Sequence, residues 1–356
     1  MGLLVIFGAG ASYDSIDPAT VHITDPSWRP PLASQLFDDR PNFNQALQNY
    51  PHFTGRLGDL RRKAAAGGLN VEHELELIKA EAATYSVARV ELAAIQFYLR
   101  QVLAECTTRW HENATGVTNY VDLLSRIDRW RHAHNERVML VTFNYDTLLD
   151  RALASFPMNL DLGSIDGYVK RDDYKLVKPH GSTNWGRLLA GRSEPNMSSE
   201  EITRRMIERV AELDFTDEYA VTGQSVQWGD HRLAFPAIAI PVEDKSEFAC
   251  PQAHLNEFVR WLTAWRERRE QVDDVSHVLV VGWRASENHF LDLITNRLEN
   301  KRVLIVDGGA TTAEIAAANL QRAGVKRDWI MCSARQGFSH FLASTDLESF
   351  LSGGPA

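Results

Sequence analysis

The chain has 356 residues, of which 44% are hydrophobic and 24% are charged, so it can bury a sizeable core and we do not expect disorder to dominate. Its formal net charge of -9 argues against nonspecific binding to nucleic-acid phosphates, so no direct nucleic-acid partner is expected. The sequence contains no run of about 18 apolar residues, so no membrane span is predicted. The apolar run at the N-terminus is too short for a signal peptide. Both observations favour a cytoplasmic protein.

Short apolar runs alternate with helical stretches in the two end portions of the chain. Most of these runs lack alternation of apolar and polar residues, as strands covered on both faces should. We predict strands at residues 3–7, 137–143, 176–178, 233–240, 278–282, 303–307 and 329–333. We predict helices at residues 145–155, 287–298, 312–323 and 340–351. The order predicts an α/β fold with a Rossmann-like, doubly wound parallel sheet.

The first predicted strand ends in a glycine turn. Gly8 and Gly10 fit a tight strand-to-helix turn in which backbone N–H groups approach a pyrophosphate at a helix N-terminus. Tyr13 replaces the third glycine of the GxGxxG pattern, so a turn that binds no ligand stays open as an alternative. Ser12 either caps the helix or hydrogen-bonds a phosphate, and capping is the simpler interpretation.

Between residues 41 and 135 no strand-like run appears, and apolar residues recur there at helical spacing. We predict an inserted helical subdomain at 41–135 that could roof a nucleotide crevice. The sheet-forming domain then consists of residues 1–40 and 136–356. The stretch 186–230 holds one plausible helix, 199–213, between polar segments, and we expect a mobile loop or lid there.

Two polar residues flank an aromatic residue directly after the strand at 137–143. Asn144 and Asp146 stand where a parallel sheet presents its ligand-facing loops, which makes both candidate site residues. Asp146 can also be interpreted as the cap of the helix that begins near Thr147. A single cap is sufficient, so capping explains Asn144 less well.

His180 follows a proline and precedes a glycine, so its backbone is held extended and then turns sharply. Most of the 12 histidines are expected on the surface, or in the core with their hydrogen bonds satisfied. His180 differs, because it stands after a short strand and before Gly181-Ser182, and this position favours a catalytic role. Imidazole is the usual base near neutral pH. An amide, a carboxylate and an imidazole at one crevice could orient a sugar, hold a leaving group and move a proton. Together with the glycine turn, they suggest an enzyme that acts on a dinucleotide.

The strand–turn–helix pattern recurs later in the chain. Gly282 ends the strand at 278–282, and Ser286 stands just before the next predicted helix. Asp307 ends the strand at 303–307, where an acidic residue can bind the ribose hydroxyls of an adenosine. A capping or turn aspartate is the equal alternative for Asp307.

The sequence lacks the motifs of several other kinds of site. The three cysteines lie far apart without a CxxC pair, so neither a disulfide framework nor a structural zinc site is predicted. No Walker A, HExxH or GxSxG pattern is present. We therefore expect no metal.

The chain resembles the sirtuin (SIR2) superfamily, and more closely its prokaryotic SIR2-like branch found in antiviral defence systems. The resemblance rests on GAGAS at residues 8–12, TFNYD at 142–146, HGS at 180–182 and VVGWRAS at 280–286. Their order spans most of the sheet-forming chain. Deacylating sirtuins usually carry two CxxC pairs and a GIPDFR-like sequence, and this chain has no CxxC pair and shows RPPL at 29–32 instead. Both departures are typical of the SIR2-like NAD hydrolases.

The resemblance also implies roles for individual residues. Asn144 and Asp146 would contact the nicotinamide ribose and carboxamide of NAD⁺, and His180 would act on the ribose hydroxyls or on the nucleophile. The residues implied to bind the pyrophosphate are Gly8, Ala9, Gly10 and Ser12. The residues implied to lie along the adenosine half are Gly282, Ser286 and Asp307.

The activity that the resemblance implies is that of a NAD⁺ glycohydrolase, which cleaves NAD⁺ to ADP-ribose and nicotinamide and depletes NAD⁺ during anti-phage defence. Such an enzyme must be gated, so we expect a homo-oligomer that docks a partner protein such as an ATPase. Two alternatives stay open: a NAD-dependent protein deacylase, and a noncatalytic NAD-binding or scaffold subunit.

Overall fold

A six-stranded parallel sheet organises the computed structural model, which describes residues 2–65, 70–156, 160–242, 248–267, 275–333 and 337–353. The strands of this sheet are β1 (Gly2–Phe7), β2 (Arg137–Thr142), β3 (Tyr174–Val177), β8 (Val275–Val281), β9 (Arg302–Val306) and β10 (Ile330–Ser333). They stand in the order β10-β9-β8-β1-β2-β3, and every neighbouring pair is parallel. The predicted parallel sheet is confirmed.

The direction of winding reverses beside β1. The chain runs from β1 to β2 and β3 on one side, and then returns to place β8, β9 and β10 on the other side. Counted along the chain, the six strands therefore stand in the order 3-2-1-4-5-6 of a doubly wound, Rossmann-like sheet. The switch point lies between β1 and β8, where short helix α1 (Ala9–Tyr13) follows β1.

Both faces of the sheet are covered, which explains why its strands are apolar throughout. Leu3, Val5 and Phe7 of β1 join a core on one face, whereas Leu4 and Ile6 join the core on the other. The first face packs against α6 (Asn119–His134), α7 (Leu148–Ala154), α12 (Gly337–Ala343) and α13 (Asp346–Leu351). The second packs against α9 (Gln252–Glu267), α10 (Asn288–Ile294) and α11 (Ala310–Arg322). The single helix predicted at 340–351 is thus two short helices, α12 and α13.

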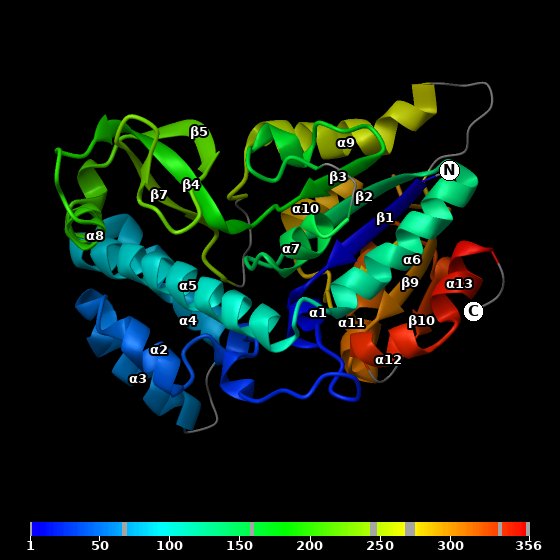
Figure 1. Ribbon diagram of the computed structural model, residues 1–356, viewed down its shortest axis with the longest axis horizontal. Helices are drawn as coiled ribbons and strands as arrows, with labels where there is room; N and C mark the ends of the chain where they lie inside the picture. Colours follow the sequence, from blue (N-terminus) through cyan, green and yellow to red (C-terminus); the bar gives the residue numbers. More distant parts are fainter. Residues whose placement is uncertain are drawn as a thin grey trace.

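The segment at 41–135 is helical, as predicted. It begins with α2 (Pro41–Leu47), α3 (Thr54–Ala65), α4 (Val71–Thr84) and α5 (Ser86–Asn113), which share one apolar core. In contrast, α6 packs on the parallel sheet, so the boundary at residue 135 stays a prediction. In Figure 1, α2 to α5 lie on the side toward which β1 points. None of the helices in the described segments has a stretch long and apolar enough to cross a membrane.

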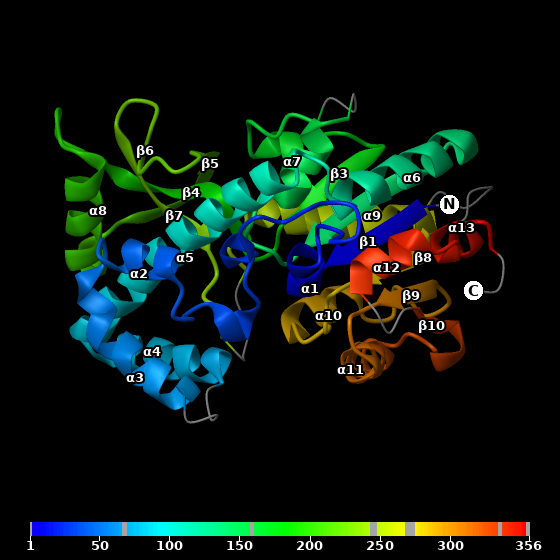
Figure 2. The same ribbon diagram turned by 60° about the horizontal axis from the view of Figure 1, so that its bottom comes forward.

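A second, antiparallel sheet stands beside this helical segment. Its strands are β4 (Gly181–Arg192), β5 (Phe215–Val221), β6 (Gln227–Trp228) and β7 (Arg232–Ile238), in the order β5-β4-β7-β6. Helix α8 (Ser199–Glu208) joins β4 to β5 and packs against α5, as Figure 2 shows. Apolar residues of β4 and β7, among them Leu189 and Phe235, join the core of α2 to α5.

Two expectations are corrected by this sheet. The strand predicted at 233–240 exists as β7, but it belongs to the antiparallel sheet and not to the parallel one. The loop or lid expected at 186–230 is instead largely regular structure, because it contains most of β4 together with α8, β5 and β6. Its helix lies within the predicted range 199–213.

Candidate functional site

Two glycine-containing turns meet at the switch point. The Gly8 N–H donates to Val281 O (3.0 Å), and the Gly10 N–H donates to Gly282 O (3.1 Å). A Cβ atom on Gly8 would lie 2.5 Å from Gly282 O, and Gly282 itself has a φ of +61°, so only glycine fits this approach without strain. The glycines therefore let the two turns pack together, and these two N–H groups are used within the protein. Ala9, between them, is exposed.

Asn144 is the centre of a buried polar cluster at this edge. Its Nδ2 donates to Gly8 O (2.9 Å), to Ser12 Oγ (2.9 Å) and, more weakly, to Tyr120 OH (3.2 Å). Ser12 Oγ and Tyr120 OH are themselves 2.9 Å apart. We call Asn144, Ser12 and Tyr120 the amide cluster. The nitrogen already donates to these partners, so Oδ1, the acceptor of the side chain, is the atom of Asn144 that could contact a ligand.

Asp146 is buried and caps the first turn of α7. Its Oδ1 accepts a hydrogen bond from the Leu148 N–H (3.0 Å), which fits the capping alternative. Burial raises the pKa of Asp146, and hydrogen bonds from Ser12 and Leu148 oppose that rise only in part. The carboxyl group therefore takes up a proton more readily than an exposed aspartate.

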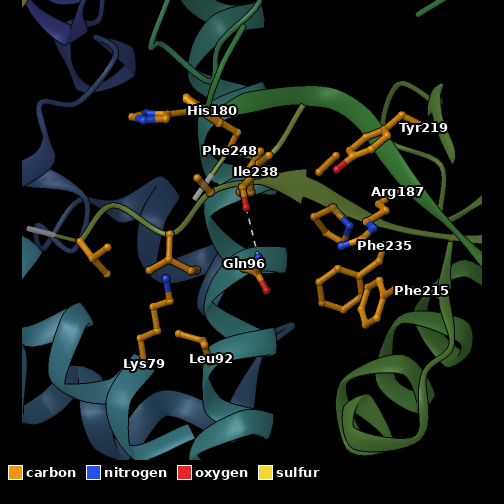
Figure 3. Close-up of a pocket in the computed structure, with 16 residues that line it drawn as sticks. Lys79, Leu92, Gln96, His180, Arg187, Phe215, Tyr219, Phe235, Ile238 and Phe248 are labelled. Carbon is orange, nitrogen blue, oxygen red and sulfur yellow. Dashed lines mark hydrogen bonds between the residues drawn. The ribbon is translucent and has the colours of Figure 1, made fainter. Parts of the chain in front are cut away.

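His180 lies in the turn between β3 and β4, and its side chain is buried among aromatic rings. Its ring stacks with the rings of Tyr145 (centroids 6.1 Å apart) and His289 (6.3 Å), and meets Phe143 edge-on at 5.0 Å. The next residue, Gly181, has a φ of +77°, which explains the glycine of the HGS motif. His180 is one of the residues that line a cavity of about 260 Å³, and in Figure 3 its ring points away from the other labelled side chains.

The loop after β2 connects the amide cluster with His180. Phe143 and Tyr145 contact the His180 ring, whereas Asn144 between them bonds to the turn after β1. The two predicted catalytic side chains thus stand at the same edge of the sheet, but they lie on different sides of this loop. Backbone bonds fix both sides, since the Phe143 N–H donates to Phe7 O (2.9 Å) and the Thr183 N–H donates to Tyr145 O (2.8 Å).

A buried ion pair close to His180 in the chain was not predicted from the sequence. Lys178 is fully buried, and its Nζ donates to Asp150 Oδ2 (2.9 Å), Asp146 O (2.8 Å) and Ser182 Oγ (2.7 Å). The Tyr168 hydroxyl also donates to Asp150, over 2.7 Å. All three donor positions of the ammonium group are therefore used, and the network holds the turn that carries His180 against α7.

The residues expected along an adenosine lie on the turns after β8 and β9. Ser286 is exposed, whereas Asp307 Oδ1 accepts hydrogen bonds from the Gly309 N–H (3.0 Å) and from the Thr312 hydroxyl. Asp307 thus closes the turn that begins α11, as its alternative interpretation proposed. Trp283, from the turn after β8, stacks on Phe143 with centroids 5.0 Å apart.

Comparison with known proteins gives no family from which roles for these residues could be taken. No family model matches the chain, and no curated protein matches it significantly. Within the described segments, no group of three or more His, Cys, Asp or Glu side chains is placed to hold a metal ion. Cys106 and Cys250 are buried there, and burial raises the pKa of each thiol to about 12, so neither is a ready nucleophile.

Proposed function

We propose that the protein is a NAD⁺ glycohydrolase that releases ADP-ribose and nicotinamide. The observation that carries this proposal is the meeting of the amide cluster with the glycine turns at the switch point between β1 and β8. In open α/β sheets, ligands bind outside the carboxyl ends of the strands at such a point. His180, one turn away at the same edge, adds an imidazole that can accept a proton.

The proposed reaction breaks the bond between C1′ of the ribose and the nicotinamide nitrogen. The bonding electrons pass to the cationic ring, which leaves as neutral nicotinamide. A water oxygen forms the new bond to C1′, and its proton passes to His180 or to solvent. Asn144 Oδ1 would orient the water or a ribose hydroxyl, and Asp146 would contact the carboxamide. Because the leaving group is already cationic, positioning is expected to contribute more than acid catalysis.

Control is part of the proposal, because an unrestrained hydrolase would drain its own cell of NAD⁺. We place the gate in self-association or in a separate partner protein, such as an ATPase of an antiviral defence system. This predicts that turnover rises when the partner binds. Size measurement and NAD⁺ turnover for the isolated chain and the reconstituted complex test it, and a monomer with full, partner-independent activity would contradict it.

The central experiment follows NAD⁺ by chromatography with purified protein, alone and with the products of neighbouring genes. Equimolar ADP-ribose and nicotinamide are expected, and His180→Gln should remove most of the activity. His340→Gln, a change at an exposed histidine on α12, is the matched control and should turn over NAD⁺ as the wild type does. Formation of O-acyl-ADP-ribose from an acylated peptide would instead indicate a deacylase.

A noncatalytic NAD-binding role is the second candidate, and one observation favours it. The Asn144 amide nitrogen, the Asp146 carboxylate and the Asp307 carboxylate all have hydrogen-bond partners within the protein. Side chains so engaged can shape the turns without taking part in a reaction. Calorimetry that detects NAD⁺ binding, with NAD⁺ unchanged in the presence of every partner, would establish this role.

A further inference from the structure

A cavity of about 260 Å³ lies between the helical segment and the antiparallel sheet. Leu92 and Gln96 of α5 line one wall, and Phe235 of β7 lines another. Gln96 Nε2 donates to Ile238 O (3.1 Å), which ties the helix to the strand beside the cavity (Figure 3). None of the glycines of the switch point lines it.

The charged residues among the described residues that line the cavity are basic. They are Lys79 and Arg187, and none of the described lining residues is acidic. Figure 3 shows Arg187 at the end opposite His180. Such a lining favours an anion or a neutral molecule over a cation.

Arg187 is held in place for contact with a ligand. Its Nε donates to Thr216 O (2.7 Å), and its guanidinium lies over the ring of Phe215 at 5.3 Å. Its Nη2 is 3.4 Å from Asp217, whose carboxylate is fully exposed, so that pair is weak. The other terminal nitrogen, Nη1, makes no hydrogen bond within the described segments, which leaves it for a carboxylate.

Aromatic rings make up the rest of this end of the cavity. Phe215 and Phe235 meet edge-to-face with centroids 5.3 Å apart, and Tyr219 lies on the other side of Arg187 from them in Figure 3. Rings arranged in this way offer both faces and edges to a planar ligand.

The volume limits the size of that ligand. A dry cavity of about 150 Å³ binds benzene, whereas sites for drug-sized molecules span roughly 300–1,000 Å³. A cavity of about 260 Å³ therefore has room for one or two fused rings with a small substituent, and is too small for a whole dinucleotide.

We propose that this cavity is a binding site for a small aromatic carboxylate, with the ring against Phe215 and Phe235 and the carboxylate on Arg187. Of the described residues, His180 is the one that the cavity shares with the proposed NAD⁺ site, and Arg187 lies at the opposite end of the cavity, so its ligand and NAD⁺ should bind at the same time. This proposal is independent of whether the protein cleaves NAD⁺.

Calorimetric titration of the full chain with indole-3-carboxylate tests the site. One molecule should bind per chain, and both Arg187→Met and the neutral analogue indole-3-carboxamide should weaken binding by about tenfold or more, as loss of a charge-assisted contact implies. Leu92→Trp should abolish binding, because the larger side chain fills the cavity. Arg204→Met, at an exposed ion-paired arginine on α8, is the matched control and should bind as the wild type does.

Four results would overturn the proposal. Three of them are no binding to the folded wild type, equal affinity for the carboxamide, and binding that both Arg187→Met and Leu92→Trp leave unchanged. Complete displacement of indole-3-carboxylate by NAD⁺ would also overturn it, since the cavity would then belong to the dinucleotide site.

Discussion

Asn144 donates a hydrogen bond from Nδ2 to Ser12 Oγ over 2.9 Å, and this bond joins the loop after β2 to the first helix of the chain. Tyr120 of α6 contacts both groups. The residue proposed to orient the substrate is therefore also a structural bridge between three elements. Any loss of activity on mutation of Asn144 must be separated from loss of this bridge.

Replacing each partner of that bond separates the two roles. Asn144→Ala and Ser12→Ala each remove a buried hydrogen bond, so both should lower the free energy of unfolding, by about 1–3 kcal/mol. Only Asn144→Ala also removes Oδ1, and it should lower NAD⁺ turnover by about 100-fold, as loss of a positioning group can. Ser12→Ala should lose far less activity. Urea unfolding and turnover, measured on the same preparations, check this, and equal losses of activity in the two variants would show that Asn144 acts only through structure.

The parallel sheet could be predicted because its strands are buried on both faces. Every residue of β1 is buried, so the strand is apolar throughout and can be recognised in the sequence as a central strand of a covered sheet. The antiparallel sheet could not be predicted in the same way. β5 carries Thr216, Asp217 and Glu218, and the last two are exposed, so this run has the composition of a loop. β7 was visible as an apolar run, but such a run does not say which sheet it joins.

The positions of the site residues could be predicted from the sequence, but their hydrogen-bond partners could not. Motif order brought Asn144 and His180 to one edge of the sheet, because strand ends follow from the strands. Their partners could not be predicted, since Ser12 and Asn144 are 132 residues apart and meet only through the fold. Lys178 stands directly before Pro179 in the sequence, and only the structure pairs it with Asp150.

The approach of the two turns at the switch point predicts a sharp difference between two glycines. Gly282 has a φ of +61°, and a Cβ atom there would clash with the backbone of Gly10 and Ala11. Gly282→Ala should therefore lower the free energy of unfolding by more than about 2 kcal/mol, from the left-handed backbone and the clash together. Gly308→Ala is the control, because a Cβ atom there meets nothing within 4 Å. Denaturant unfolding that gave similar stabilities for the two variants would contradict this account of the turn.

The ion pair of Lys178 and Asp150 predicts that replacing the lysine alone destabilises the protein more than replacing both residues. Lys178→Met leaves the Asp150 carboxylate buried without its cation, which should cost about 3–5 kcal/mol of unfolding free energy. Adding Asp150→Asn removes the uncompensated charge and still lets the side-chain oxygen accept from Tyr168. The double variant should thus be more stable than Lys178→Met alone. Chemical denaturation of the single and double variants measures this, and a double variant less stable than the single would show that the charge of Asp150 is not what makes the lysine necessary.

His277 predicts a loss of stability in mild acid. Burial, with a smaller contribution from the positive charge of Arg302, lowers the pKa of His277 to about 4 from an ordinary value of 6.5. Its ring packs edge-on against Phe350 with centroids 5.0 Å apart, so a protonated imidazole would be poorly solvated there.

The sign of the effect follows from which state binds the proton. Between pH 6.5 and about 4 the unfolded chain protonates His277 and the folded chain does not, so stability falls as the pH falls through this window. On going from pH 7 to pH 5, the wild type should lose at most about 2 kcal/mol more unfolding free energy than His277→Gln. Urea unfolding at the two pH values measures the difference, and His340→Gln, at an exposed histidine, should keep the wild-type dependence. If His277→Gln shows the same acid sensitivity as the wild type, other groups carry it and His277 titrates alike in both states.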